Sequence, residues 1–134
     1  MPRTLRLLLV EDSESDTLLL LNQLQQSGYI VDWSRVETAP ALCAALDGGP
    51  WDVVLSDDAL PQFNGLEALA MVRAKAPELP FILVSGTIDE TVAAAAKEAG
   101  VDDYVMKDNL QELVPVIERL TQASRERRAN SRGI

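Results

Sequence analysis

Pairs of acidic side chains follow two short apolar runs of the chain. Residues 5–10 lead into Glu11 and Asp12, and a second run leads through a serine into Asp57 and Asp58. An apolar run of this length that ends in polar residues predicts a buried strand whose carboxyl end reaches the rim of a sheet. Because successive side chains on a strand point to opposite faces, the two adjacent aspartates cannot share one role. We expect one of them to do chemistry.

Two further polar side chains stand at the ends of later apolar runs. Ser85 follows residues 81–84, and Lys107 follows residues 104–106. In an open parallel sheet, ligands bind outside the carboxyl ends of the strands. Three carboxylates, a hydroxyl and an ammonium are therefore expected to converge at one edge, from Glu11, Asp12, Asp57, Ser85 and Lys107.

Three acidic groups in one site repel one another unless a cation neutralises them. A hard divalent cation with oxygen ligands, Mg²⁺ or in its place Mn²⁺, fits this requirement. An aspartate beside such an ion is a competent nucleophile toward a phosphoryl donor, and Lys107 can hold the phosphoryl oxygens as charge develops. Ser85 can then donate a hydrogen bond to the bound phosphate. The residue types therefore predict transfer of a phosphoryl group to an aspartate.

The elements that must position these groups alternate between strands and helices. An apolar fraction of 47% with only 4% aromatic residues favours an aliphatic core between helices and a parallel sheet. Strands are expected at residues 5–10, 29–34, 53–55, 81–84 and 104–106. Helices are expected to begin near Asp12 or Ser13, and near Thr38, Gly65, Asp89 and Pro115. Glu14 and Asp16 are expected in the first turn of the first helix, near the positive end of its dipole.

The connections between these elements have the length that right-handed crossovers need. We therefore predict one α/β domain, with a five-stranded parallel sheet and five helices distributed over both faces. The domain is expected to span residues 1–122. Residues 123–134 lose the apolar periodicity and are expected to form an Arg-rich extension or a disordered tail. The last helix leading into this basic segment favours a connector to something beyond Ile134.

Composition excludes several classes of protein. The net charge of −9 argues against a nucleic-acid surface, because phosphate binding depends on clustered Lys and Arg. The sequence contains no histidine, which removes histidine-based triads and phosphohistidine chemistry on this chain. Cys43, the one cysteine, is expected to be a small core-facing residue. The apolar run at the N-terminus is too short to span a bilayer, so a cytoplasmic protein without membrane contact is expected.

The arrangement of these residues resembles the response-regulator receiver domains of two-component signalling. The resemblance covers residues 5 to about 120. The first motif behind the resemblance is the acidic pair after the first strand. The second is Asp57, which stands four residues before Pro61 and eight before Gly65. The others are the residues that end the last two strands. Those last motifs are Ser85-Gly86 and Tyr104-Val105-Met106-Lys107. Each motif alone is weak, but their order and spacing together are highly specific.

The resemblance implies a flavodoxin-like sheet with strand order 2-1-3-4-5 and assigns a role to each site residue. Asp57 would be the phosphoacceptor, Lys107 the phosphate-binding lysine, Ser85 the switch hydroxyl and Tyr104 the switch aromatic. The cation would be held by Glu11, Asp12, Asp57 and the backbone carbonyl of Ala59, with Asp12 the more direct ligand of the acidic pair. The alternation of side chains along the strand and the four-residue spacing to Pro61 both favour Asp57 over Asp58 as the phosphoacceptor. Asp58 would turn outward.

The resemblance also implies partners. A histidine kinase or a histidine phosphotransfer protein would supply the phosphoryl group, which would switch a surface formed by the fourth helix, fifth strand and fifth helix. That surface could also form a homodimer. The protein would be a signalling phosphoacceptor and no enzyme beyond its own phosphorylation and dephosphorylation.

Three positions depart from the family pattern and leave alternatives open. Asp108 follows Lys107 where a cis proline is usual, Gly86 replaces a common alanine, and Ala59 offers no polar side chain to position a hydrolytic water. One alternative is an interaction module that uses the same fold without regulated phosphorylation. Another is an aspartyl-phosphate hydrolase, which would need an aspartate where Ala59 stands.

Overall fold

The computed structural model describes residues 3–57, 64–86 and 90–132. Within these residues a five-stranded sheet has the order β2-β1-β3-β4-β5, and every neighbouring pair of strands is parallel. Its strands are β1 (Arg3–Val10), β2 (Tyr29–Val36), β3 (Val53–Ser56), β4 (Phe81–Ser85) and β5 (Asp103–Met106). The predicted α/β fold and strand order are confirmed.

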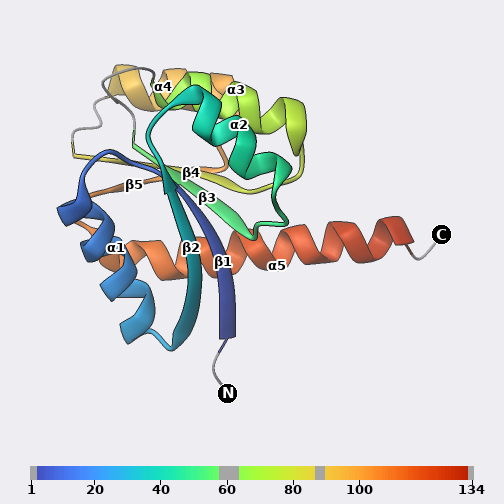
Figure 1. Ribbon diagram of the computed structural model, residues 1–134, viewed down its shortest axis with the longest axis horizontal. Coiled ribbons are helices and arrows are strands. Elements are labelled where there is room, and N and C mark those ends of the chain that lie inside the picture. The colour runs from blue at the N-terminus through green and yellow to red at the C-terminus, as the bar shows by residue number, and fades with distance from the viewer. Residues whose placement is uncertain (1–2, 58–63, 87–89, 133–134) are drawn as a thin grey trace.

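Helices cover both faces of the sheet, as the sequence predicted (Figure 1). They are α1 (Glu14–Gln26), α2 (Ala39–Asp47), α3 (Gly65–Lys75), α4 (Glu90–Ala99) and α5 (Leu113–Arg132), with a short 3-10 helix η1 (Leu110–Glu112) before α5. Helices α1 and α5 pack in one hydrophobic cluster, and α2, α3 and α4 contribute to the other. Figure 1 shows the same division, with α1 and α5 together on one side of the sheet.

The burial of strand β1 on both faces explains why its sequence is a continuous apolar run and does not alternate between apolar and polar residues. Leu7 and Leu9 belong to the cluster beneath α1 and α5, while Leu8 and Val10 belong to the opposite cluster, and all four are fully buried. A parallel strand covered by helices on both faces must be apolar at every position. Burial of both faces therefore fixes the strand in place and brings its carboxyl end to the rim.

Polar caps set where the helices that flank the site begin. The side-chain hydroxyl of Ser13 accepts a hydrogen bond from the backbone N–H of Asp16 at 3.2 Å, which caps α1. Asn64 and Glu67 form a reciprocal capping box at the start of α3. Each cap satisfies backbone N–H groups that have no partner inside the helix. Of the two caps that the sequence offered for α1, Asp12 and Ser13, the structure shows Ser13, whereas the Asn64 cap was not foreseen.

Helix α5 continues past the point where its apolar periodicity stops. The helix reaches Arg132, the last residue that the structure describes. In Figure 1 the C-terminal part of α5 extends beyond the other helices. After Pro115 the sequence up to Arg132 contains no Pro or Gly and is rich in Ala, Arg and Glu, residues with high helix propensity. Helix propensity therefore extends α5 past the point where the apolar periodicity stops, and the predictions of a domain boundary at residue 122 and of a separate segment at 123–134 stay predictions.

Among the described residues, no helix combines the length and the apolar character needed to cross a membrane.

The burial of β3 generates a prediction about stability. Leu55 lies two residues before Asp57 and is 1% exposed. We expect Leu55→Ala to lower the free energy of unfolding by about 2–5 kcal/mol, because it removes buried apolar surface and leaves a cavity. Leu66→Ala is the matched control, since Leu66 is 38% exposed on α3, and a change of about 0.5 kcal/mol or less is expected. Urea denaturation followed by circular dichroism measures both, and equal effects would contradict the prediction.

Candidate functional site

Backbone hydrogen bonds carry the acidic residues just past the ends of two neighbouring strands. The N–H of Glu11 donates to the carbonyl of Val36 at 3.1 Å, and the N–H of Asp57 donates to the carbonyl of Val10 at 2.9 Å. The sheet ladder is thus extended by one residue on β1 and on β3. This extension places the side chains of Glu11 and Asp57 at the same carboxyl edge, as the sequence predicted.

The three predicted acids form one cluster. One carboxylate oxygen from each of Glu11, Asp12 and Asp57 can be chosen so that all three lie within 4.8 Å of one another. Glu11 is 2% exposed, and its Oε1 accepts a hydrogen bond from the backbone N–H of Ser13 at 3.1 Å. Asp12 is exposed, so the cluster opens to solvent on its side. An all-oxygen set with one open side fits a hard divalent cation that keeps some of its water ligands.

Lys107 brings a positive charge into this cluster. Its backbone N–H donates to the carbonyl of Ser85 at 2.8 Å, which continues the β4–β5 ladder past the end of β5. Its Nζ lies 3.1 Å from Glu11 Oε2 and 3.3 Å from Asp57 Oδ2. The predicted convergence of Lys107 with two of the acids is therefore found.

The balance of burial and charge raises the pKa of Lys107 above its ordinary value. Partial burial on its own would lower the pKa, because it disfavours the charged form. The hydrogen bonds to Asp16 and Glu11, together with the charges of Glu11 and Asp57, outweigh this effect. Lys107 is therefore a fixed cation throughout the physiological range.

Asp16 is a member of the site that sequence reasoning missed. Its Oδ2 lies 2.7 Å from Lys107 Nζ, closer than either of the other two carboxylates. From the sequence it was expected only as a helix-stabilising acid. A carboxylate in the first turn of a helix that begins at the rim stays near that rim, so its position four residues after Asp12 indicated closeness to the site but not the direction of the side chain.

Ser85 and Tyr104 lie where the sequence placed them along their strands. Ser85 is the last residue of β4, is 1% exposed, and pairs in register with Met106. Tyr104 is partly buried and packs against the cluster shared by α2, α3 and α4. Asp58, Ala59 and Pro61 lie outside the described residues, so the predictions made for them stay predictions.

The loop after Lys107 turns at once toward α5. The N–H of Asn109 donates to the carbonyl of Met106 at 2.9 Å, and η1 follows directly. Asp108, which stands where the family usually has proline, is exposed in this turn. Pro115 lies in the first turn of α5, as expected from its missing N–H.

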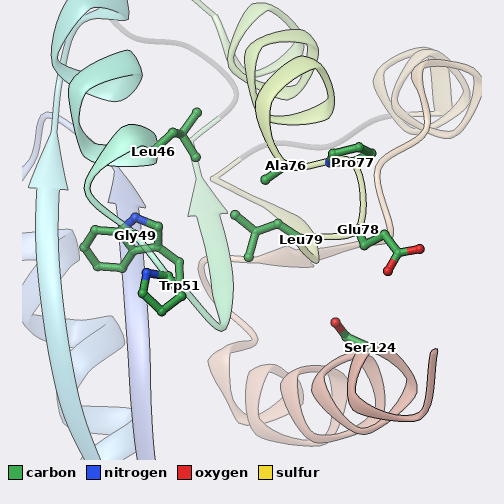
Figure 2. A pocket seen from close by; sticks show the side chains of 9 residues that line it. Leu46, Gly49, Trp51, Ala76, Pro77, Glu78, Leu79 and Ser124 are labelled. Atoms are coloured by element: carbon green, nitrogen blue, oxygen red, sulfur yellow. The ribbon is translucent and has the colours of Figure 1, made fainter. Parts of the chain in front are cut away.

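A separate cavity lies at the opposite edge of the sheet. It has a volume of about 270 Å³ and is lined chiefly by the loops that precede β3 and β4, including Leu46, Trp51 and Leu79. Figure 2 shows Ser124 of α5 on the far side of this cavity from Leu46. The indole N–H of Trp51 donates to the carbonyl of Ala45 at 2.8 Å. Because this cavity is largely apolar and lies at the amino ends of the strands, it is distinct from the acidic site.

Comparison with known proteins agrees with this geometry. The family described as the response regulator receiver domain matches residues 7–118. The transcriptional regulatory protein TcrA of Mycobacterium tuberculosis strain H37Rv is 34% identical over 118 residues, which cover 87% of this chain and 46% of that protein. The chain therefore belongs to the response regulator receiver domain family, and it spans about half the length of curated relatives such as TcrA.

Solved structures share the fold. NtrX from Brucella abortus superposes with a TM-score of 0.84 at 25% identity, covering 98% of this chain and 30% of that one. The receiver domain of the sensor histidine kinase PA1611 from Pseudomonas aeruginosa PAO1 gives a TM-score of 0.76 at 24% identity, covering 89% of this chain and 98% of that one. The latter structure is described with a magnesium ion coordinated in its active site cleft.

The neutralising role of Lys107 can be tested through stability. We expect Lys107→Met to lower the free energy of unfolding by about 1–3 kcal/mol without divalent cations, because it leaves neighbouring carboxylates uncompensated. Added Mg²⁺ should reduce this deficit, since the ion supplies the missing positive charge. The control is Lys97→Met on the exposed face of α4. Thermal unfolding with and without Mg²⁺ measures the effect, and a deficit that Mg²⁺ leaves unchanged would contradict the assignment.

Proposed function

We propose that this receiver domain takes a phosphoryl group onto Asp57 from a phosphohistidine of a partner protein. The observation that supports the proposal is the convergence of the Asp57 carboxylate with Glu11, Asp12 and Lys107 at one edge of the sheet. The chain has no histidine of its own, so the donor histidine comes from elsewhere. A histidine kinase or a histidine phosphotransfer protein is the proposed donor.

In the proposed transfer, an oxygen of the Asp57 carboxylate attacks the phosphorus of the donor. A P–O bond forms while the P–N bond to the imidazole breaks, and the ring nitrogen keeps the electron pair and takes up a proton to leave as neutral imidazole. Lys107 Nζ, 3.3 Å from Asp57 Oδ2, is close enough to hold a phosphoryl oxygen in the transition state. A carboxylate oxygen attacks with its own lone pair and loses no proton in the step, so the transfer calls for no general base.

The acidic cluster is the proposed holder of Mg²⁺ or Mn²⁺. Glu11, Asp12 and Asp57 supply oxygen ligands, and the carbonyl of Ala59 remains a predicted further ligand. The magnesium ion in the PA1611 receiver domain supports this assignment by fold similarity. When bound, the ion would neutralise charge on the transferring phosphoryl oxygens.

Ser85 and Tyr104 are proposed to carry the switch. Ser85 is buried at the end of β4, where its hydroxyl can donate to a phosphoryl group on Asp57. Tyr104 is partly buried beside the same strand, so it can turn inward when Ser85 moves. Such a shift would change a surface made by α4, β5 and α5, through which the domain would bind its output or a second copy.

Exposed leucines beside the site suit a docking surface for the donor. Leu18 and Leu19 on α1 are 66% and 56% exposed, two and three residues after Asp16. Exposed apolar side chains that form a contiguous patch mark interaction sites on soluble proteins. We propose that the donor packs against this end of α1 and presents its phosphohistidine to Asp57.

Direct phosphorylation tests the proposed function. Incubation with acetyl phosphate and Mg²⁺ should add one phosphoryl group, detected by intact mass. Asp57→Asn should abolish the addition because it removes the nucleophile, whereas Asp58→Asn should retain it and so serves as the adjacent control. An unmodified wild-type chain, or labelling that survives Asp57→Asn, would refute the proposal.

Cation binding provides an independent test. Asp12→Asn should weaken Mg²⁺ binding by roughly tenfold or more, because it replaces a charged ligand with a neutral one. Asp52→Asn, at the opposite edge where Asp52 accepts from the backbone N–H of Arg6, should leave Mg²⁺ affinity nearly unchanged. Isothermal titration calorimetry measures both, and the alternative of a phosphorylation-independent module is favoured if the wild-type chain binds no Mg²⁺.

A further inference from the structure

Asp16 makes the shortest contact with the lysine of the site, and no role for it follows from the proposed transfer. We infer that Asp16 restrains Lys107 and thereby opposes loading of a phosphoryl group onto Asp57. Asp16 is a positioning residue that acts through Lys107. The inference rests on the proposed function and assigns to that site an internal brake on phosphorylation.

The hydrogen-bonding capacity of Lys107 supports this role. An ammonium has three N–H donors, and within the described residues three carboxylates approach it, at 2.7 Å from Asp16, 3.1 Å from Glu11 and 3.3 Å from Asp57. All three donors are thus engaged before any phosphoryl group arrives. To bind phosphoryl oxygens fully, Lys107 must loosen one of these contacts, and the shortest of them is to Asp16.

Asp16 differs from the other two partners of Lys107 in its relation to the cation site. Glu11 and Asp57 belong to the described group of mutually close carboxylates, whereas Asp16 is not in that group. A divalent cation would therefore compete with Lys107 for Glu11 and Asp57 and leave its contact with Asp16 in place. Asp16 is therefore the partner that stays hydrogen-bonded to Lys107 after a divalent cation has bound.

The position of Asp16 is fixed by its helix. It lies in the first turn of α1, where its backbone N–H donates to Ser13 Oγ at 3.2 Å. The side chains of Asp16 and Lys107 are 33% and 20% exposed, and Leu19, Leu20 and Leu110 lie around them. Partial shielding by leucines weakens the screening that makes fully exposed ion pairs negligible.

Charge gives the inference a distinctive signature. The negative charge of Asp16 repels an incoming phosphoryl group, and its hydrogen bond competes for Lys107, so both effects oppose phosphorylation. The same negative charge attracts a divalent cation at the neighbouring cluster. Neutralising Asp16 should therefore move phosphorylation and cation affinity in opposite directions, which simple damage to the fold would not do.

The test compares Asp16→Asn with Glu14→Gln in the full chain. Glu14 is in the same helical turn, but its side chain is 85% exposed and 3.7 Å from Arg35, so this control removes the same charge without touching Lys107. At saturating Mg²⁺, Asp16→Asn should speed phosphorylation by acetyl phosphate about three- to tenfold and weaken Mg²⁺ binding about two- to threefold. Glu14→Gln should change both by less than about twofold.

Two further variants at Asp16 separate the effect of its charge from the effect of the substitution itself. Asp16→Ser is a second neutral variant that suits a first helical turn and should behave like Asp16→Asn. Asp16→Glu retains the charge and should restore a slow, wild-type rate. Slower or unchanged phosphorylation in both neutral variants, or an equal acceleration in Glu14→Gln, overturns the inference while the proposed function stands. Failure of the wild-type chain to accept a phosphoryl group would overturn the proposed function, and the inference with it.

Discussion

The arrangement of the carboxyl edge depends on one interaction, the ammonium of Lys107 among three carboxylates. Glu11, Asp16 and Asp57 approach it from the end of β1, the start of α1 and the end of β3. Without a positive charge, acids brought this close would repel one another and favour separation of the elements that carry them. Lys107 therefore permits a compact acidic site, while its raised pKa keeps the compensating charge in place at physiological pH.

The fold supplies the precision that this interaction needs. β1 is buried on both faces, and its alternating side chains enter two separate hydrophobic clusters. A shift of one residue in register would exchange every side chain between the clusters, so the register is strongly specified. The strand ends are consequently fixed relative to one another. The backbone hydrogen bonds of Glu11, Asp57 and Lys107 continue the regular pairing for one residue past the strand ends.

The sequence predicted those parts of the site that depend on strand ends. Glu11, Asp57 and Lys107 each follow an apolar run, and the parallel sheet necessarily brings such positions to one edge. Asp16 was missed because a helical side chain can turn toward the site or toward solvent, and only the packing of α1 decides which. Likewise, the apolar periodicity stops after Leu120, but the residues that follow have high helix propensity, and α5 continues to Arg132.

The Lys107 contacts also define how a change at Asp57 could reach the rest of the domain. The side chain of Lys107 donates a hydrogen bond to Asp16 on α1. Its backbone N–H donates a hydrogen bond to the carbonyl of Ser85 at the end of β4. A phosphoryl group on Asp57 would replace a carboxylate partner of Lys107 with a more highly charged one. The balance among the three contacts would then change, and that change would act on α1 and on the β4–β5 edge together. Under the proposed transfer, a lysine with partners at the ends of β1, β3 and β4 and in the first turn of α1 would link a local gain of charge at Asp57 to the positions of these four elements.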